Sequence, residues 1–397
     1  MVGFLFVVFQ ARFLGTAIKG QVATVNSIVA ITSILFDLGI SQAYPYFKRN
    51  SNVNVIPILI KIAFIPLIFG IAASIAAVVY FDISAKYIAV MILTSIMVYE
   101  GIVSYITLIE NPNKRHWFDV YVMFMELVFV IALWAFAQPN FFLGILIISM
   151  KYIMKAVMCT FELRKNIFHK TESIFKWIPK LVKFGFFPML SLLMSTLNYR
   201  VGIIMMDGRV ADAAIGIYSV GITLAERIWL IPDAIKGVMT SRLTKGKDEQ
   251  EVTLAIRLCN TGCLLLICGI VLLGKPFITF IFGSEYREAY GITMLLLFGV
   301  FSMIYYKIIS SYNTVMGKQR ISFIFLSIAA SLNYACCFIL IPPLGIYGAG
   351  ISSVTSYALC GILFIAHFCK CTKVPIRDVL IIKREDFAVA KSFLIRK

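Results

Sequence analysis

The sequence carries little charge. Only 14% of its 397 residues are Asp, Glu, Lys or Arg, whereas a soluble globular domain has about 25% charged residues. Hydrophobic residues make up 60% of the chain and the mean hydropathy is +0.90. No aqueous core could bury so many apolar side chains, which excludes soluble enzymes and disordered scaffolds. The solvent for most of this chain is lipid.

Cysteine pairs and sets of metal ligands are also lacking. The nine cysteines are odd in number and lie mostly inside apolar runs, so they behave as small hydrophobic residues and exclude a secreted disulfide domain. His367, Cys369 and Cys371 alternate near the end of the last run, but a closed zinc site needs four ligands and the other histidines are distant in sequence. We expect no metal site and no cofactor.

Long apolar runs are what the sequence does have. A helix of about 20 residues crosses a hydrocarbon core of about 30 Å, and open sheet cannot satisfy its backbone in lipid. About twelve such runs predict an all-α polytopic membrane protein. The first run reaches only about 21 Å as a helix, which predicts a truncated or misassigned start. The runs are 1–14, 21–47, 55–81, 87–109, 117–137, 141–161, 178–206, 213–243, 252–273, 290–315, 321–341 and 346–368.

The distribution of Lys and Arg predicts the orientation. Cytoplasmic connections carry an excess of basic residues, and alternate connections differ sharply here. One set holds only Lys19, Lys86, Arg209, Lys275 and Arg287. We therefore expect both termini to be cytoplasmic, and we attribute the +17 formal charge to topology rather than to nucleic-acid binding. The richer set holds Lys48, Arg49, Lys114, Arg115, Arg164, Lys165, Lys170, Lys176, Lys180, Arg242, Lys245, Lys247, Lys318 and Arg320.

Two internal matches predict a duplicated architecture. At an offset of 196, Gly20 falls on Gly216, Asp37 on Asp233 and Arg49 on Lys245. At an offset of 207, Tyr99-Glu100 falls on Tyr306-Lys307, Ser104-Tyr105 on Ser311-Tyr312 and Thr107 on Thr314. Both matches agree with a division into six plus six spans. Halves with an even number of spans have the same orientation, so we expect a pseudo-twofold axis along the membrane normal and a cleft between two six-helix bundles.

This division predicts four regions. An N-terminal six-helix bundle occupies 1–165 and a C-terminal six-helix bundle occupies 181–372. A basic cytoplasmic linker, 166–180, joins them. The tail, 373–397, mixes apolar and basic residues and is expected to lie on anionic lipid as an amphipathic cytoplasmic helix.

Several short motifs, in order along the chain, resemble the polysaccharide biosynthesis membrane proteins, that is the Wzx-type O-antigen flippase branch of the MOP superfamily, to which the MATE transporters also belong. The resemblance covers roughly residues 9–373. It is carried by Ala11-Arg12-Phe13-Leu14-Gly15, Phe36-Asp37-Leu38-Gly39-Ile40-Ser41-Gln42-Ala43, Leu181-Val182-Lys183-Phe184-Gly185, Gly216-Ile217-Tyr218-Ser219, Trp229-Leu230-Ile231-Pro232, Phe282-Gly283-Ser284-Glu285-Tyr286 and Gly345-Ile346-Tyr347-Gly348-Ala349-Gly350.

The resemblance implies a transporter rather than an enzyme. It would move a glycan attached to undecaprenyl diphosphate, such as an O-antigen or capsule repeat unit, from the cytoplasmic to the outer leaflet of the bacterial inner membrane by alternating access. Its implied partners are the lipid-linked glycan, membrane lipids and the polymerase and chain-length proteins of the same pathway. Many relatives place an acid after the position of Arg200, whereas Val201-Gly202 follow it here, so no ion-coupling role is transferred from that acid.

Cations within the spans are candidate contacts for a diphosphate. An isolated charge at a helix centre costs roughly 2.5 to 3.5 kcal/mol by insertion scales, so each needs a partner or water. Arg200 and Lys307 are the deepest and are the favoured substrate contacts. Lys151 and Lys155 lie one turn apart and either line a lumen or snorkel to the interface. Arg227 is a further candidate, while Arg257 lies near a helix end where snorkelling is the simpler interpretation.

Buried acids are candidates for gating or proton coupling. Glu100 falls opposite Lys307 in the repeat and could pair with it across the cleft as a gate or a structural latch. Asp233 follows Pro232, which removes a backbone donor and weakens the helix locally, although membrane prolines are often simply tolerated. Asp119 and Glu126 lie in the fifth span. The set of gating or coupling candidates is Glu100, Asp37, Glu226 and Asp233.

Tyrosines within the spans are candidates for stacking on sugar rings, since a phenol offers both a flat face and a hydroxyl. Packing and interfacial roles are the alternative for each of them. The stacking candidates are Tyr99, Tyr199, Tyr306 and Tyr312.

Two other functions compete with the flippase. A MATE-like exporter of organic cations would prefer an acidic or aromatic lumen, which the deep Arg200 and Lys307 do not provide. A membrane polysaccharide polymerase would need a sizeable outward loop with catalytic groups, and every predicted connection is short. No nucleophile and base, phosphate loop or metal constellation stands out in the sequence.

Overall fold

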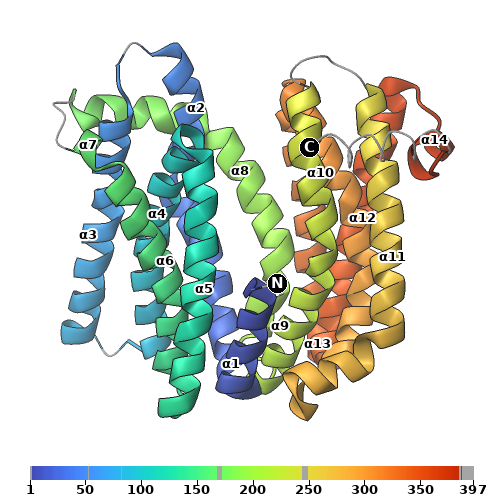
Figure 1. The fold of residues 1–397 in the computed structure, drawn as a ribbon, viewed down its shortest axis with the longest axis horizontal. Coiled ribbons are helices and arrows are strands. Elements are labelled where there is room, and N and C mark those ends of the chain that lie inside the picture. The colour runs from blue at the N-terminus through green and yellow to red at the C-terminus, as the bar shows by residue number, and fades with distance from the viewer. Residues whose placement is uncertain are drawn as a thin grey trace. The chain divides into compact units, whose positions relative to one another are not determined.

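A computed structural model describes residues 2–51, 53–81, 83–167, 172–243, 249–383 and 386. These residues form helices and connections without a β-strand (Figure 1), and the predicted apolar runs fall on helices, with the run 21–47 interrupted at Leu38-Gly39. The helices are α1 (Val2–Asp37), α2 (Ile40–Asn50), α3 (Ile56–Tyr80), α4 (Ala85–Glu110), α5 (Pro112–Phe136), α6 (Phe141–Glu162), α7 (Arg164–Ile167), α8 (Ile174–Met206), α9 (Asp212–Glu226), η1 (Arg227–Trp229), α10 (Leu230–Leu243), α11 (Glu249–Phe282), η2 (Ser284–Tyr286), α12 (Ala289–Val315), α13 (Gln319–Thr372) and α14 (Ile376–Leu380).

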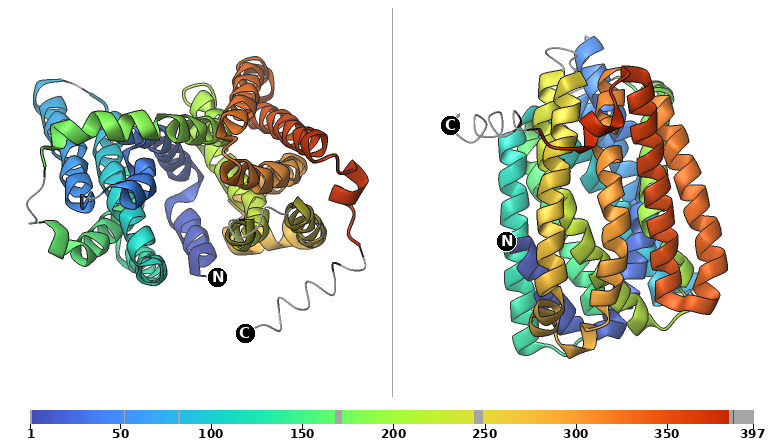
Figure 2. Two further views of the ribbon diagram at one scale, coloured as in Figure 1. Left: turned by 90° about the horizontal axis from the view of Figure 1, so that it is seen from above. Right: turned by 90° about the vertical axis from the view of Figure 1, so that its right-hand side faces the viewer.

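Ten helical segments of the described residues are long and apolar enough to cross a membrane. The sequence predicts twelve runs because two of these segments are each divided by a glycine bend into two runs. α13 has 54 residues and would be about 81 Å long if straight. Gly345, with φ 55°, follows Pro342-Pro343 and reverses the chain, so the two halves of α13 lie side by side (Figure 2). The hydroxyl of Ser356 donates to the carbonyl of Ala329 at 2.7 Å between them.

A second bend divides α1. Gly15 has φ 68°, a conformation that costs glycine nothing and strains other residues. The bend brings Lys19 Nζ to 2.5 Å from Gln10 Oε1, two side chains that a straight helix would hold far apart. Phe13 and Leu14 before the bend and Val22 after it pack together with residues of α5 and α6. The predicted polytopic all-α fold is confirmed.

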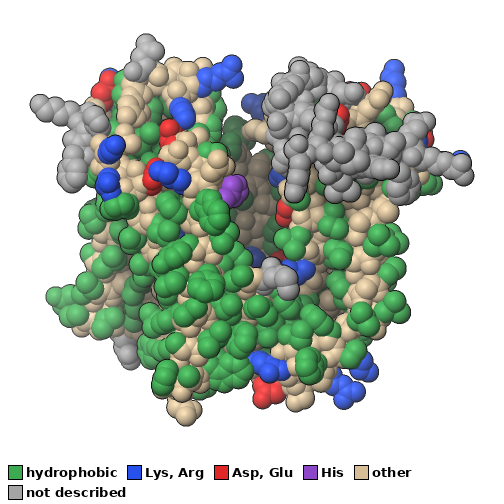
Figure 3. All heavy atoms as spheres, in the orientation of Figure 1, with side chains coloured by type: hydrophobic (Ala, Val, Ile, Leu, Met, Phe, Trp, Pro, Cys, Tyr) green, Lys and Arg blue, Asp and Glu red, His purple; other side chains and the backbone are tan. Residues whose placement is uncertain are grey.

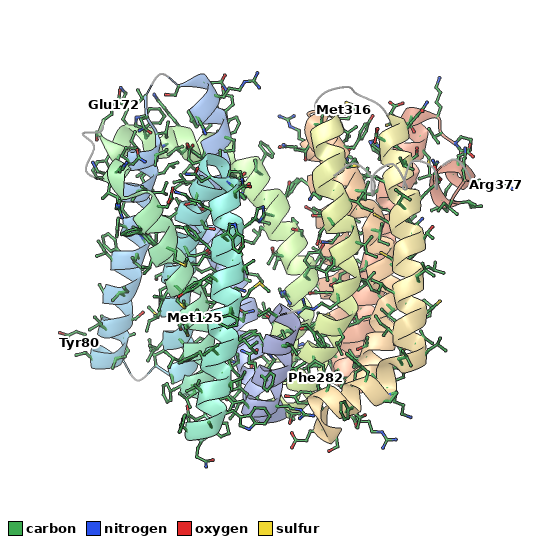
Figure 4. All side chains as sticks on the ribbon, viewed as in Figure 1. Tyr80, Met125, Glu172, Phe282, Met316 and Arg377 are labelled. Atoms are coloured by element: carbon green, nitrogen blue, oxygen red, sulfur yellow. The ribbon has the colours of Figure 1, made fainter. Side chains whose placement is uncertain are left out.

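The chain forms two compact units, Met1–Gly216 and Ile217–Lys397. The N-terminal unit contains α1 to α8 and the first turn of α9, and the division between the two compact units follows Gly216. The second half of the predicted linker, 166–180, is the start of α8. Glu172 and Tyr80 lie at opposite ends of the N-terminal unit, and Met316 and Phe282 at opposite ends of the C-terminal unit (Figure 4). The six-plus-six bundle boundaries stay a prediction.

The surface of the N-terminal unit separates apolar from charged side chains along its long direction. Hydrophobic side chains cover its lower part in the face shown, while charged side chains gather near the upper end with α2 and α7 (Figure 3). Lys48, Arg49, Lys114 and Arg164 are exposed in these upper elements or next to them. This distribution fits the basic end that the topology analysis assigns to the cytoplasm.

Glycines set two close helix contacts within the N-terminal unit. A Cβ on Gly185 of α8 would overlap the carbonyl of Gly39, which has φ 75° between α1 and α2. These glycines belong to two of the motifs behind the family resemblance, 36–43 and 181–185. The backbones of α2 and α8 can therefore approach only because neither residue has a side chain.

The second contact joins α1 to the first turn of α9. A Cβ on Gly20 would overlap the carbonyl of Asp212, and a Cβ on Gly216 would overlap the carbonyl of Thr16. The offset of 196 relates Gly20 to Gly216 and also Thr16 to Asp212, so the contact is two-fold symmetric in sequence. Gln21 Nε2 adds a hydrogen bond of 2.8 Å to Asp212 Oδ2. The internal repeat thus has a structural counterpart at this crossing.

Candidate functional site

Four charged side chains meet in the N-terminal unit, and we call Glu100, Arg115, Asp119 and Lys155 the N-terminal charge cluster. Lys155 Nζ of α6 lies 3.2 Å from Glu100 Oε1 of α4 and 3.2 Å from Asp119 Oδ1 of α5. Arg115 pairs with Asp119 one turn along α5, and its Nε donates to Ser104 Oγ at 2.6 Å. Two cations and two acids from three helices therefore neutralise one another inside the unit.

The inner end of this cluster is tightly enclosed. The side chains of Glu100 and Lys155 are 8% and 15% exposed, whereas that of Asp119 is 42% exposed. Glu100 Oε1 has ion-pair distance to Lys155 but no hydrogen bond of suitable geometry. A buried carboxylate held by one cation without full hydrogen bonding is sensitive to any change in its partner.

Further charged residues lie near this cluster. Glu126 of α5 is buried and interacts electrostatically with Lys151 and Lys155. The phenol of Tyr152 lies within electrostatic range of Glu126, Lys155 and Arg200 of α8. Lys151 is exposed and Arg200 is half-buried, in contrast to the enclosed Lys155. Lys151 Nζ lies 5.9 Å from the ring centroid of Tyr152, so three of the predicted cavity cations lie around this tyrosine.

This neighbourhood suits an anion by its chemistry. Arg200 offers a planar fork of donors that matches two phosphate oxygens, and Lys151 offers a mobile point charge. Lys155 already faces two carboxylates and is less available. Among the residues of this neighbourhood, Arg200 and Lys151 are thus the better candidates for substrate contact, and Lys155 is the better candidate for holding α4, α5 and α6 together.

The C-terminal unit holds a separate charge pair between α12 and α10. Lys307 Nζ lies 2.8 Å from Asp233 Oδ1 and 3.1 Å from Oδ2. The ammonium also lies 4.6 Å from the ring centroid of Trp229, whose Nε1 donates to the carbonyl of Val300 at 2.9 Å. An anion that contacts Lys307 would therefore compete with Asp233 and with a cation–π contact.

Glu100 and Lys307 each have an ion-pair partner on a neighbouring helix of their own unit. Glu100 pairs with Lys155 and Lys307 pairs with Asp233. A pair between Glu100 and Lys307 across the cleft stays a prediction. Whether either pair acts as a gate stays a prediction.

The helix that precedes Asp233 is locally distorted. Residues Arg227–Trp229 form a 3₁₀ turn between α9 and α10, shortly before Pro232. A 3₁₀ stretch inside a long helical segment often marks a hinge. Arg227 and Glu226 are half-buried beside this turn and interact electrostatically. The predicted weak point near Pro232 thus coincides with a change of helix type.

The tyrosine candidates lie mostly in packed positions. Tyr99 is 6% exposed, its hydroxyl is 2.8 Å from Thr160 Oγ1, and its ring centroid lies 4.9 Å from that of Phe64. The ring centroid of Tyr306 lies 5.3 Å from that of Phe364. Tyr312 is 5% exposed and donates to Glu249 Oε1 at 3.3 Å. Tyr199 is half-buried next to Arg200. Tyr199 and Tyr306 are each adjacent in sequence to a candidate substrate cation, Arg200 and Lys307 respectively.

Asp37 has a local structural partner. Its Oδ2 accepts a hydrogen bond of 2.8 Å from Ser41 Oγ, and its Oδ1 lies 3.4 Å from the backbone N–H of Ser41. The carboxylate therefore closes the turn at Leu38 and Gly39, where both residues have positive φ. Its predicted coupling role is not needed to explain its position.

Asp119 is among the buried acids named from the sequence, whereas Arg115 is not among the predicted site residues. Arg115 falls in a predicted connection between two apolar runs, although the residue is only 9% exposed. The available signal was the i, i+4 spacing of Arg115 and Asp119, which places opposite charges on one helix face. No sequence pattern indicates the cation–π contact between Trp229 and Lys307, because the two residues lie on different helices.

Arg257 has a partner that the snorkelling interpretation did not foresee. Its Nε and Nη2 each donate to a carboxylate oxygen of Asp386 at 2.7 Å, and its Nη1 donates to the carbonyl of Asp378 at 2.7 Å. Val379 is fully buried between these contacts. α14 and Asp386 therefore dock on α11 and form what we call the C-terminal clasp. Residues 384, 385 and 387–397 of the predicted amphipathic tail lie outside the described residues.

The clasp should depend on Arg257 and on pH. Burial raises the pKa of Asp386, but the hydrogen bonds from Arg257 and from the Lys383 N–H outweigh it and bring the pKa below its usual value. A lowered pKa stabilises the docked state above the usual Asp pKa of about 3.9, and this stabilisation is lost as the pH falls below it. We expect Arg257→Gln to increase hydrogen exchange in 376–383 at neutral pH.

Asp378→Asn is the matched control for the clasp. It removes only the exposed pair with Lys383, which spans 3.0 Å, and leaves the carbonyl that Arg257 uses. Exposed pairs contribute little, so exchange should stay close to that of the unmodified chain. Equal exchange in Arg257→Gln and the control would show that the clasp does not depend on the guanidinium.

The described helices, ten of them long and apolar enough to cross a membrane, define an all-α polytopic membrane protein. The family model described as polysaccharide biosynthesis protein matches residues 9–291, and the chain belongs to this family. No curated protein sequence matches the chain significantly.

Solved structures share the fold at low sequence identity. A structure described as lipid II flippase MurJ in an inward closed conformation has a TM-score of 0.73 and 17% identity, and the match covers 100% of this chain and 90% of that chain. An inward-facing multidrug resistance MATE family transporter of the MOP superfamily has a TM-score of 0.67 and 11% identity, covering 94% of this chain and 96% of that chain. An outward-facing conformation of a multidrug resistance MATE family transporter has a TM-score of 0.57 and 13% identity, covering 94% of both chains.

Proposed function

We propose that the protein flips an undecaprenyl-diphosphate-linked oligosaccharide, an O-antigen or capsule repeat unit, across the bacterial inner membrane by alternating access. Membership of the polysaccharide biosynthesis family and the fold shared with a lipid II flippase support a lipid-linked glycan as substrate. The observation that carries the proposal is that two cations lie near Tyr152 in the N-terminal unit: Lys151 Nζ is 5.9 Å from the ring centroid, and Arg200 is within electrostatic range of the phenol. We take both termini to be cytoplasmic and the protein to be a transporter rather than an enzyme.

The proposed transport assigns different tasks to the charged groups. The diphosphate has to leave water and headgroups, and cations beside a hydrated path offset that cost. Arg200 and Lys151 would contact the anion, while Lys307 would exchange Asp233 for it during the cycle. The glycan lipid, membrane lipids and the polymerase and chain-length proteins of the pathway are the proposed partners.

A deletion strain tests the substrate class. We expect undecaprenyl-diphosphate glycan to accumulate on the cytoplasmic side and the surface polymer to disappear, as measured by mass spectrometry of lipid extracts and by surface staining. A second candidate, an exporter of organic cations, is favoured by the shared MATE fold. Normal surface glycan together with lower resistance to cationic drugs in the deletion strain would contradict the flippase proposal and support the exporter.

Complementation of the same strain tests the site. Arg200→Ala and Lys307→Ala should each abolish surface polymer while the protein inserts at normal abundance, because each removes a cation that the diphosphate needs. Lys183→Ala is the control, since Lys183 is an exposed cation on the same helix as Arg200. Full surface polymer in both alanine variants would remove these two residues from the mechanism.

A further inference from the structure

An apolar groove runs along the outer side of α6 in the N-terminal unit, and we call it the α6 groove. It has a volume of about 530 Å³ and is walled by α3, α4, α6 and α7. Phe64 and Tyr99 contribute to its inner wall, and Ile153 and Val157 of α6 lie at its rim, where they are 43% and 61% exposed. The groove opens to the apolar surface of the unit rather than to a closed interior.

The floor of the α6 groove offers no free polar group. The hydroxyl of Tyr99 is paired with Thr160 Oγ1 at 2.8 Å, and Thr160 also donates to the carbonyl of Ala156 at 2.7 Å. A sugar or a hydrated ion would find no hydrogen-bond partner there, whereas a hydrocarbon chain needs none and would break no hydrogen bond. The groove therefore favours an aliphatic occupant.

One end of the α6 groove is basic. Arg164, the first residue of α7, lines the groove, and its guanidinium carbon lies 3.9 Å from the ring centroid of Phe161. In the part of the chain that is described, no carboxylate pairs with this guanidinium. Lys165 follows it and is also exposed. Both belong to the basic connections that the topology analysis places in the cytoplasm, so the open charge lies at the level of lipid headgroups.

The length of the groove matches one leaflet. From Ile153 to Arg164 the chain advances eleven residues, or about 16 Å as a helix, which is about half of a hydrocarbon core of 30 Å. A chain that reaches from the headgroup level to the bilayer midplane fills this length. We propose that the α6 groove binds one anionic phospholipid of the cytoplasmic leaflet, with an acyl chain in the groove and its phosphate at Arg164.

The site shares two helices with the N-terminal charge cluster. Tyr99 and Thr160 join α4 to α6 at the groove floor, and Glu100 and Lys155 of the same two helices form an ion pair. A bound acyl chain therefore packs against the pair of helices that carries the cluster. The assignment does not depend on which substrate the protein transports.

Native mass spectrometry of the full chain in detergent tests the proposal. Phosphatidylglycerol and phosphatidylcholine with identical acyl chains are added separately. We expect one phosphatidylglycerol to be retained preferentially, and Arg164→Ala to weaken its binding about tenfold because a charge-assisted contact is lost. Val157→Trp, which places a large ring at the rim, should reduce binding while leaving Arg164 intact.

Arg49→Ala is the matched control, since Arg49 is an exposed arginine of α2 on the same end of the unit and outside the groove. It should retain phosphatidylglycerol like the unmodified chain. Equal retention of the two lipids, or equal loss of phosphatidylglycerol in the Arg49 and Arg164 variants, would show that the groove has no specific site for an anionic phospholipid. Displacement of phosphatidylglycerol by undecaprenyl phosphate in an Arg164-dependent manner would assign the site to the isoprenoid lipid and overturn the phospholipid.

Discussion

Replacing Gly20 with leucine should prevent accumulation of folded protein. A Cβ at Gly20 would overlap the carbonyl of Asp212 and lie 3.0 Å from the backbone nitrogen of Gly216, and neither backbone can move without separating α1 from α9. Overpacking a buried site typically costs about 1 to 3 kcal/mol, and more where only backbone is available to shift. Fluorescence-detected size exclusion and the melting temperature of the detergent-solubilised protein measure the effect.

Gly101→Ala is the control for this prediction. Gly101 lies within α4 and a Cβ there would meet nothing within 4 Å. Alanine is favoured over glycine in a helix by about 1 kcal/mol, so this variant should melt at the same temperature or higher. If Gly20→Leu melts like the unmodified chain, α1 and α9 do not approach as closely as the structure places them.

Replacing Lys155 with methionine should destabilise the protein by about 3 to 5 kcal/mol, the usual cost of breaking a buried ion pair by removing one partner. Methionine keeps the length of the side chain but leaves Glu100 without its cation in a position that is 8% exposed. Asp119 loses a contact as well but keeps Arg115. The melting temperature of the purified protein should fall accordingly.

A second substitution separates stability from transport. Adding Glu100→Gln to Lys155→Met removes the uncompensated charge and should recover most of the lost melting temperature. Lys151→Met, one turn away and exposed, should leave the melting temperature nearly unchanged while reducing surface polymer. A stable Lys155→Met variant would show that the cluster does not hold α4, α5 and α6 together.

The helices were predictable because hydropathy is a local property. Each run from 55–81 to 346–368 is apolar over a length that fits the bilayer, and each is helical in the structure. The predicted run 178–206 begins four residues after the start of α8. The first turn of α8 includes the exposed Phe175 and Lys176, and a search for apolar runs of membrane length does not detect such a turn. Gly15 and Gly345 also mark breaks that the apolar pattern had already located between runs.

The glycines of the family motifs are visible in the sequence, but the reason for them is not. Motif order along the chain pointed to the polysaccharide biosynthesis family, and the family model confirms this. Only the structure shows that Gly39 meets Gly185 and that Gly20 meets Gly216. The sequence shows where the glycines are. It does not show which backbone packs against each of them, because that backbone belongs to another helix.

The sequence by itself determined the membrane environment, the helices and the set of ionisable residues that lie within them, because these follow from composition and from windows of neighbouring residues. The tertiary structure decided which charges meet. Lys155 pairs with Glu100 and Lys307 with Asp233 because helix packing brings distant turns together, and an ion pair forms only at the few ångströms where Coulomb attraction offsets desolvation.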